Sequence, residues 1–547
     1  MRAPSKPLAS LLAAASLFAC KPTDPRNPEA WLSRLGESDA RKRVQAVQEL
    51  RKLKAKVAAP QVAELLKDPQ VREDAALALG DLGGPEQVQP LLDAIDTTVG
   101  AGSDQAARVA NRTNSKIADS LGAIGDAKAC DALLRLARAK DDLVRLSATQ
   151  SLGKVRCKAA AQELARMVDD ESTPPILIKK AIVALGQIGE PSAIPALQHA
   201  LVLERMGVSF LSEASFALVQ LGAPAVEPML ALLEDKDAAW LAWAKEYNRA
   251  TAGTYAKAAI VLGDLGDARA APALLTRLKY LDPDPLPSTS KLLTSAVRQF
   301  AADALGRLRS KEAAPAIAAL VSTKDNGDED LSTFSANALV FIGDRAQAKG
   351  LVKAASSGAI RPRIPVLQAA ALLGEPELAA EIEALAAKEK KGKPANCAKS
   401  MQELLQAPSA DEKGACDKLA EAIAATAAPL KAAAACAPSG SAEACWTKAL
   451  TAEGPLVRAR AAYELGRLGA AGAVPALIRA CADQDYNARL AAIRSTEWFL
   501  PVAAAKPALQ AGAKTLSAQL DAEQGRIQFV KVNEELKRLQ WKLAHVQ

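Results

Sequence analysis

The chain has 547 residues and a net charge of +7, from 69 lysine and arginine residues against 62 aspartate and glutamate residues. Hydrophobic residues make up 50% of the chain, and aromatic residues only 3%. An alanine-rich, aromatic-poor composition is typical of an all-α fold, because alanine is the best helix former and lets helices pack closely. The charge is nearly balanced and diffuse, so we expect no nucleic-acid partner.

The first 20 residues, MRAPSKPLASLLAAASLFAC, have the three parts of an export signal. Arg2 and Lys6 supply positive charge, and residues 8–19 form an apolar stretch too short to cross a bilayer as a helix. The last four residues resemble the lipobox of bacterial lipoproteins, in which the leader is removed and the cysteine is lipidated. We therefore predict a signal peptide over residues 1–19 and lipidation of Cys20. An ordinary secretory leader, with an incidental cysteine, is the alternative.

A flexible tether is predicted over residues 20–37. Prolines at positions 22, 25 and 28 prevent a helix there. An acyl-anchored protein of this kind lies on a membrane and does not span it. By resemblance to enteric lipoproteins, the absence of aspartate directly after Cys20 favours the outer membrane, with the folded part facing the periplasm.

From residue 38 onward one pattern recurs, and it is clearest in residues 71–95, VREDAALALGDLGGPEQVQPLLDAI. We expect Gly80 and Gly83 to close a tight turn in the left-handed conformation, followed by a second helix with Pro90 in its first turn. Apolar residues recur every three or four positions before the turn, which predicts one helix face: Val71, Ala75, Leu79 and Leu82. Prolines occupy the place of Pro90 in later units: Pro195, Pro228, Pro272, Pro315 and Pro475.

The register of the units follows from the apolar residue before the last position of each turn. These anchor residues are spaced by 29 to 34 residues at their shortest steps: Leu53, Leu82, Ile124, Val155, Ile188, Leu221, Leu265, Leu308, Ile342, Leu373 and Leu468. A degenerate unit over residues 487–520 brings the total to about twelve, which predicts an α-solenoid.

The repeat resembles the short HEAT-like repeats found in phycobilisome lyases. Those repeats begin Asp-x-x-Val-Arg, turn on Ala-Leu-Gly-x-Leu-Gly and carry a proline in the second helix. Residues 68–72, Val144-Arg145 and Val457-Arg458 supply that beginning here. The resemblance implies HEAT-like repeats over residues 38–387 and 454–520 in an armadillo-type superhelix, and it implies no particular activity.

Three insertions follow a second helix and precede the next first helix, at residues 97–108, 236–254 and 281–290. Insertions at equivalent places emerge on one edge of a solenoid, often the binding edge. The second insertion contains or adjoins a cluster of large aromatic residues: Trp240, Trp243, Tyr247 and Tyr255. Two interpretations stay open: the rings extend the core where the helices lengthen, or they bind a protein partner.

The repeat is interrupted over residues 388–453, where a charged linker from Lys388 to Pro394 and a helical insertion are predicted. Half of all the cysteines lie there: Cys397, Cys416, Cys436 and Cys445. In an exported protein these favour two disulfides, although spacing does not determine the pairing. The segment lacks histidine and a Cys-x-x-Cys pair, so we predict no metal site. Cys130 and Cys157 flank a repeat turn and are candidates for a third pair, leaving Cys481 unpaired and buried.

Residues 521–547 depart from the repeat. Apolar residues recur there at alternating steps of four and three, from Val532 to Val546. This spacing is that of a coiled coil, but it lasts for too few turns to form one alone. We predict a helix that caps the exposed end of the last repeat.

No enzymatic motif is recognisable. The two histidines, His199 and His545, adjoin no nucleophile in a triad pattern, and phosphate-binding loops and His-Glu-x-x-His are missing. We therefore predict a non-catalytic scaffold that binds a protein partner in the cell envelope, without a cofactor or a small-molecule substrate. The alternative is a lyase-like enzyme on HEAT-like repeats whose active site the sequence does not reveal.

Overall fold

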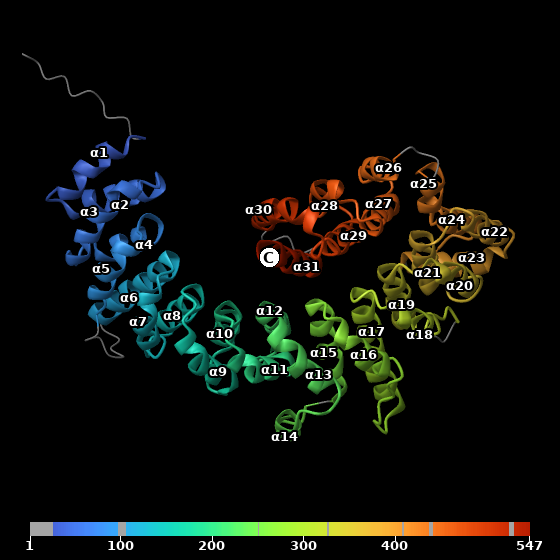
Figure 1. Cartoon of the computed structure of the whole chain (residues 1–547), viewed down its shortest axis with the longest axis horizontal. Coiled ribbons are helices and arrows are strands. Elements are labelled where there is room, and N and C mark those ends of the chain that lie inside the picture. Colours follow the sequence, from blue (N-terminus) through green and yellow to red (C-terminus); the bar gives the residue numbers. More distant parts are fainter. Residues whose placement is uncertain are drawn as a thin grey trace, which may run out of the picture. The chain divides into compact units, whose positions relative to one another are not determined.

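The structure is a computed structural model. It describes residues 26–96, 105–249, 251–324, 328–406, 408, 410–436, 441–523 and 530–546, with only the backbone of residues 530 and 531. Cys20 and the predicted signal peptide lie outside the described residues. The chain divides into two compact units, Met1–Ala160 and Ala161–Gln547, whose helices are labelled in Figure 1.

The first unit consists of helical hairpins. Its helices are α1 (Pro28–Leu32), α2 (Ala40–Lys52), α3 (Ala59–Glu64), α4 (Arg72–Leu82), α5 (Val88–Asp93), α6 (Gln105–Ile124), α7 (Cys130–Leu136) and α8 (Asp142–Lys154). Short 3-10 turns precede most of the second helices, as Pro85–Gln87 precedes α5. A disulfide joins Cys130, at the start of α7, to Cys157, which follows α8.

The second unit continues the same hairpins. Its helices are α9 (Ala161–Asp169), α10 (Pro175–Ile188), α11 (Ile194–Val202), α12 (Leu211–Leu221), α13 (Val226–Leu233), α14 (Ala238–Glu246), α15 (Thr251–Leu265), α16 (Ala271–Arg277), α17 (Pro287–Arg307), α18 (Ala314–Ala318), α19 (Glu329–Ile342), α20 (Ala348–Ala354), α21 (Ile360–Leu373), α22 (Leu378–Lys390), α23 (Pro394–Leu405), α24 (Ala415–Ala425), α25 (Ala428–Cys436), α26 (Ala442–Ala449), α27 (Pro455–Leu468), α28 (Val474–Ala480), α29 (Tyr486–Glu497), α30 (Lys506–Ala522) and α31 (Val530–Ala544). Within the described residues the only strands form one antiparallel hairpin, β1 (Glu204–Arg205) and β2 (Val208–Ser209). The fold is an all-α solenoid, as the sequence predicts.

The helices begin and end where local chemistry favours it. Each anchor residue of the predicted register is the last residue of a first helix or follows it directly, as Leu82 ends α4 and Leu468 ends α27. The side chain of Asp141 caps α8 by accepting hydrogen bonds from two backbone N–H groups. Pro195 and Pro475 lie in the first turns of α11 and α28, where a missing N–H costs little.

The glycines of the clearest repeat correct one expectation. Gly80 lies inside α4, where a Cβ atom would meet Oγ of Ser120 at 2.8 Å. Gly83 has a φ of −78°, so neither glycine is left-handed. The chain leaves α4 in extended conformation at Gly83 and Gly84, and Pro85 disfavours helical geometry at Gly84 directly before it.

Two glycines at the end of α10 have separate roles, one in helix packing and one in the turn. A Cβ atom on Gly186 would lie 2.8 Å from Cα of Ala217, so this glycine allows α12 to approach closely. Gly189 ends the helix with a φ of 71°, which glycine adopts without strain. The repeat therefore needs one glycine for packing between helices and one for the turn.

Successive first helices of the second unit pack against one another in a row: α10, α12, α15, α17, α19 and α21. The row then continues from α21 to α27, α29 and α31, so it bypasses the helices α23 to α26. Its core is aliphatic, and Leu185, Leu262 and Leu339 are fully buried. Figure 1 shows α31 between α29 and the part of the row around α12 and α15.

Residues 388–453 contain α23 to α26, with disulfides from Cys397 to Cys416 and from Cys436 to Cys445. The charged linker predicted from Lys388 is partly helical, because α22 extends to Lys390 and lysine and glutamate are good helix formers. The stretch Ala415–Cys436 is long and apolar enough to cross a membrane by length and composition alone, and half of its apolar window is buried inside the fold.

Candidate functional site

The predicted aromatic cluster is divided between the core and the surface. On α14 the rings follow one another, with 5.1 Å between the centroids of Trp240 and Trp243 and 5.1 Å between those of Trp243 and Tyr247. Trp240 is buried, Trp243 is half-buried and Tyr247 is exposed. Trp243 also stacks on His199 of α11 at 4.0 Å, and Nδ1 of that histidine lies 2.9 Å from Oδ1 of Asp169.

Tyr255 lies apart from this series, buried in α15. Its hydroxyl donates a hydrogen bond of 2.6 Å to the carboxylate of Asp235, and the guanidinium of Arg277 lies 3.5 Å from its ring centroid. Burial, together with the carboxylate of Asp235, raises the pKa of Tyr255 to about 12. Trp240 and Tyr255 therefore pack in the core, whereas Tyr247 is left at the surface of the insertion.

The candidate cysteines are paired within the two units as described above, which supports the prediction of disulfides. Cys481 is free and buried, and burial raises the pKa of its thiol to about 12. Disulfides persist in oxidising environments, so the three pairs indicate that the chain folds in one. Among the described residues, no group of three or more His, Cys, Asp or Glu side chains could hold a metal ion.

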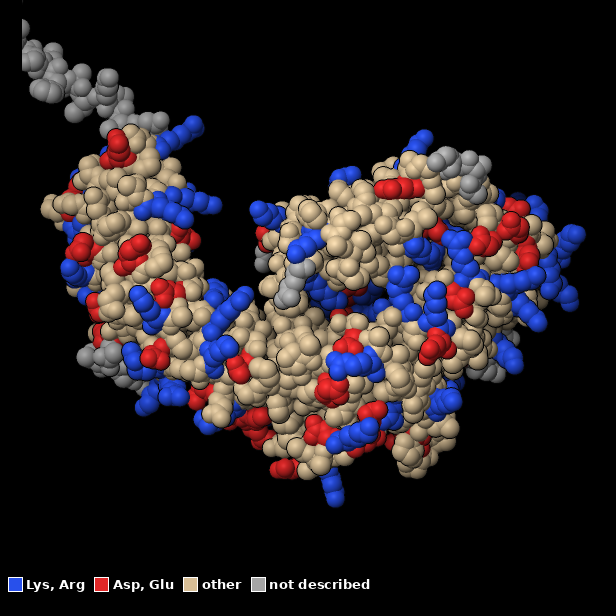
Figure 2. All heavy atoms as spheres, in the orientation of Figure 1, with Lys and Arg blue, Asp and Glu red and all other residues tan. Residues whose placement is uncertain are grey.

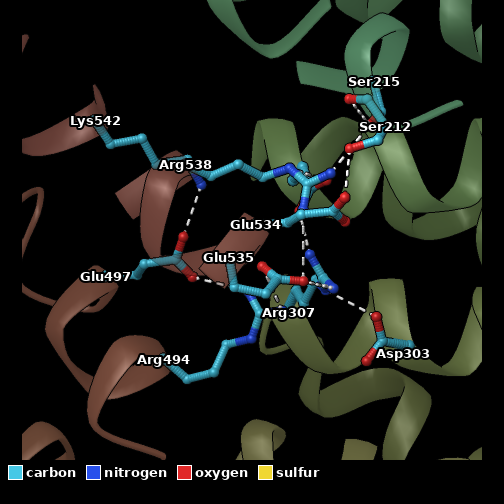
Figure 3. A network of polar contacts seen from close by, with 11 residues as sticks. Ser212, Ser215, Asp303, Arg307, Arg494, Glu497, Glu534, Glu535, Arg538 and Lys542 are labelled. Carbon is cyan, nitrogen blue, oxygen red and sulfur yellow. Dashed lines mark hydrogen bonds and ion pairs between the residues drawn. The ribbon is translucent and has the colours of Figure 1, made fainter. Parts of the chain in front are cut away.

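A cluster of buried charges joins α31 to helices on both sides of it (Figure 3). Arg307 of α17 contacts three carboxylates: it donates to Asp264 of α15, to Asp303 at 2.8 Å and to Glu535 of α31 at 2.9 Å. We call the cluster the α31 network; it comprises Asp264, Asp303, Arg307, Arg494, Glu497, Glu535, Arg538 and Lys542. Its four basic and four acidic side chains balance.

The position of α31 results from its two faces. Its apolar face, which includes Leu536 and Leu539, is fully buried, and α31 packs on α29 and α30. Its polar face meets earlier helices: Nη2 of Arg538 donates to Oγ of Ser215 in α12 at 3.0 Å, and Ser212 donates to Glu534 at 2.6 Å. The helix thus connects the end of the second unit to α12, much earlier in the same unit.

The α29 side of the network is equally well paired. Arg494 lies 3.0 Å from Glu497 and 3.1 Å from Glu535, and Lys542 lies 2.9 Å from Glu497. Burial disfavours ionised Glu535, but Arg307, Arg494 and Arg538 outweigh it and hold the pKa of that carboxyl well below its usual range. Burial likewise opposes ionisation of Glu497, and Lys542 and Arg494 keep its pKa lowered.

Two cavities of the second unit adjoin the α31 network. The first, which we call the Phe334 cavity, has a volume of about 700 Å³ and is lined from α10, α12, α15, α17, α19, α29 and α31, and by Ser209 of β2. The second, with about 880 Å³, is lined by Trp498, Trp541 and the turns after α12 and α15. Arg307, Phe341 and Arg494 line both, so the cavities meet at the network. Figure 2 shows basic and acidic side chains within this hollow.

A second buried arginine cluster joins α27 to the row across the insertion. Arg460 donates to the carbonyl groups of Ala371 at 2.8 Å and Gly374 at 3.0 Å, at the end of α21. Glu464 lies 2.8 Å from both Arg460 and Arg467. Burial lowers the pKa of Arg460 to about 10, so the guanidinium stays charged at neutral pH. These bonds hold the solenoid continuous where the repeat is interrupted in sequence.

Sequence reasoning does not anticipate the α31 network. The apolar seam from Val532 predicts the buried face, and the steps of three and four between Glu535, Arg538 and Lys542 indicate that these charges share another face. Nothing in that spacing identifies the partners, because Arg307 precedes Glu535 by 228 residues.

Comparisons with known proteins concern the repeat. The HEAT repeats profile matches residues 28–111, 110–177, 140–209 and 444–523, and the PBS lyase HEAT-like repeat profile matches residues 255–280 and 297–323. No curated protein sequence matches the chain.

Similar solved structures share little sequence with this chain. A crystal structure of importin beta is similar over 95% of this chain and 67% of its own, with 12% identity and a TM-score of 0.42. Human deoxyhypusine hydroxylase is similar over 54% and 98%, with 21% identity and a TM-score of 0.21. The complex of CpcE and CpcF of phycocyanin lyase from Nostoc sp. PCC7120 is similar over 56% and 99%, with 21% identity and a TM-score of 0.23. The helical hairpins and the two profile matches identify this chain as a HEAT-repeat protein.

Proposed function

We propose that this chain is a non-catalytic scaffold that binds a protein partner in the bacterial cell envelope. A lipid on Cys20 holds it on a membrane, in the order signal peptide 1–19, tether, repeats 38–387, insertion 388–453, repeats 454–520 and capping helix 521–547. The tether is shorter than the predicted residues 20–37, because proline is tolerated in a first helical turn and α1 begins at Pro28, with Trp31 buried. The folded part faces the periplasm, with the outer membrane favoured. Export is supported by the three-part leader and by the three disulfides.

The observation that carries the binding function is the Phe334 cavity. It is a concave, partly enclosed space of about 700 Å³ with aromatic side chains in its wall, and its charges are already paired with one another. Such a wall favours recognition through shape, apolar contact and hydrogen bonding. HEAT-repeat solenoids present extended surfaces of this kind to protein partners.

The insertion edge offers a second candidate surface. On α14 Trp243 is half-buried and Tyr247 is exposed, and Leu281 and Leu286 in the next insertion are 73% and 63% exposed. Trp240 and Tyr255 support this edge from the core. A partner that contacts both surfaces would bind the edge through these exposed apolar side chains.

A lyase-like enzyme is the alternative, suggested by the PBS lyase HEAT-like repeat matches. The two matched segments coincide with the hairpins α15–α16 and α17–α18, the regular framework of the repeat. The α31 network, which adjoins both, contains carboxylates held ionised by arginine and lysine side chains and therefore unsuited to donate protons.

Crosslinking of the full-length chain in intact cells tests the binding function. We expect discrete covalent adducts with one or a few envelope proteins, enriched over a Cys20→Ala control that is released from the membrane. Loss of an acyl label and of membrane fractionation in Cys20→Ala would support the anchor. Absence of any adduct with an envelope protein would contradict the scaffold. A wild-type chain that carries no acyl label and fractionates in the same way as Cys20→Ala would contradict the anchor.

A further inference from the structure

We propose that the Phe334 cavity binds an extended, uncharged segment of a partner polypeptide and takes one large apolar side chain of that segment between its rings. This inference rests on the proposed scaffold function and specifies the chemistry of the partner. Three independent features of the wall carry it: the pairing of its charges, the unpaired amides and the aromatic floor.

The charged side chains of the wall are paired with one another, so the cavity offers no unpaired charge to a charged ligand. Lys179 pairs with Glu213 at 2.8 Å, and the carboxylate of Glu534 accepts from Ser212 at 2.6 Å. Arg307, Arg494 and Arg538 share Glu535 and its neighbours in the α31 network. The ionised side chains of the wall are thus four basic and four acidic: Lys179, Arg307, Arg494 and Arg538 against Glu213, Asp303, Glu534 and Glu535. A charged ligand group would lose hydration there without gaining an unpaired counter-ion.

The accessible unpaired groups of the wall are amides and a hydroxyl. Among its charged side chains, Oε2 of Glu213 and Nε of Arg494 and of Arg538 are buried without a hydrogen bond, although each of these side chains belongs to an ion pair. The carboxamides of Asn337 and Asn487 and the hydroxyl of Thr333 have no hydrogen-bond partner among the described residues, and all three line the cavity. Both asparagines are exposed. A carboxamide presents a donor and an acceptor together, which matches the N–H and C=O groups of a peptide unit. An extended backbone keeps those groups available, because it forms no internal hydrogen bonds.

The aromatic floor supplies the energy of binding. Phe300 of α17 and Phe334 of α19 meet edge to face with centroids 5.9 Å apart, and Phe341 contributes a further ring to the wall. Leu211 and Leu490 complete the apolar part from α12 and α29. Burial of one large apolar side chain in such a pocket is the usual anchor of a peptide interface.

The site is held in shape before any ligand binds. Glu535 and Arg538 belong both to the α31 network and to the cavity wall. The ion pair of Glu535 with Arg307 fixes α31 against α17, and the hydrogen bond from Arg538 to Ser215 fixes it against α12. Preorganisation of this kind reduces the entropy lost on binding.

Selection from a random peptide display library against the full-length chain tests the inference. We expect enriched peptides of low charge that share one aromatic or large aliphatic residue. Fluorescence anisotropy of a labelled enriched peptide should then show that Phe334→Ala and Asn337→Ala each weaken binding about tenfold, as for loss of an anchor or a paired hydrogen bond. Asn337 is an exposed helical position, so its replacement by alanine leaves the fold intact.

Leu405→Ala at the end of α23 is the matched control, because it removes an exposed apolar side chain that does not line the Phe334 cavity. The inference is overturned if the peptides respond to Leu405→Ala and ignore both cavity variants. It is equally overturned if they carry a required charge, with affinity that falls steeply with salt, or if no peptide is enriched. In each of these cases, adducts with envelope proteins in cells would still support the scaffold function, so the two failures are distinguishable.

Discussion

Arg307 of α17 and Glu535 of α31 form a buried ion pair, with 2.9 Å between Nη2 and Oε1, although 228 residues separate them in sequence. Glu535 also contacts Arg494 of α29 at 3.1 Å. One carboxylate therefore joins three helices from distant parts of the second unit. Loss of one partner of a buried pair leaves an uncompensated charge, which costs far more than the pair contributes at a surface.

Glu535→Ala should accordingly destabilise the second unit. We expect a loss of about 3–5 kcal/mol in the free energy of opening, as for broken buried pairs. Hydrogen exchange followed by mass spectrometry should show faster exchange in α12, α17 and α31. Asp81→Ala is the matched control, because the pair of Arg51 and Asp81 is exposed and should contribute less than about 1 kcal/mol. Equal effects of the two variants would show that the α31 network does not hold the unit together.

The α31 network should make the second unit sensitive to acid. The folded-state pKa values of Glu535 and Glu497 are lowered, so their stabilisation is present above the pKa of an unfolded glutamate, about 4.3, and is lost as pH falls toward the folded values. We expect urea midpoints that hold from pH 7 to about 5 and then decline. Glu535→Gln removes one such group, so its decline should be shallower. A midpoint that falls with the same slope in both proteins would contradict this assignment.

Gly186 should resist substitution. A Cβ atom there would lie 2.8 Å from Cα of Ala217, so Gly186→Ala must push α12 away from α10 and should cost about 1–3 kcal/mol. Gly253, in the first turn of α15, has no atom within 4 Å of a Cβ position. Gly253→Ala should therefore stabilise the chain by up to about 1 kcal/mol. Thermal unfolding of the two variants should move in opposite directions, and a shift of the same sign would refute the packing role of Gly186.

The cysteines should differ in reactivity. Cys481 is buried with a raised pKa, so it should not react with iodoacetamide in the folded protein, with or without mild reductant. Rapid labelling of Cys481 before unfolding would contradict its placement.

Replacement of Cys397 and Cys416 by serine should lower the free energy of unfolding by about 2–4 kcal/mol and raise hydrogen exchange in α23 and α24. The first unit, which has a disulfide of its own, is the internal control, and its hydrogen exchange should not change.

Much of this architecture was predictable because it is local. The spacing of apolar residues and the turn position set the ends of the first helices, so the anchors from Leu53 to Leu468 fall at those ends. The role of Gly80 was not predictable, because only the neighbouring helix determines how closely its backbone can approach. The glycines of the repeated motif thus predicted where the turn lies, but not that one of them allows two helices to pack closely.

The candidate site depended on distant contacts and was therefore beyond sequence reasoning. The aromatic residues Trp240 and Tyr255 were candidates for partner binding, but both are buried. The rarity of aromatic residues in a composition does not distinguish a core position from a surface position. The Phe334 cavity is assembled from seven helices spread between residues 179 and 538. Its asparagines, Asn337 and Asn487, belong to no recognisable sequence motif. Only the structure shows that both line the same cavity.

Site-specific photocrosslinking tests the central claim, that this chain binds a protein partner in the Phe334 cavity, most directly. A photoreactive phenylalanine analogue is placed at Phe334 in the full-length chain in cells, and in a matched variant at Lys353, an exposed position on the second helix α20. The account predicts an adduct with a defined envelope protein from position 334, through an extended segment with an apolar residue at the crosslink, and none from position 353. Equal adducts from both positions, or adducts from position 353 alone, would contradict it.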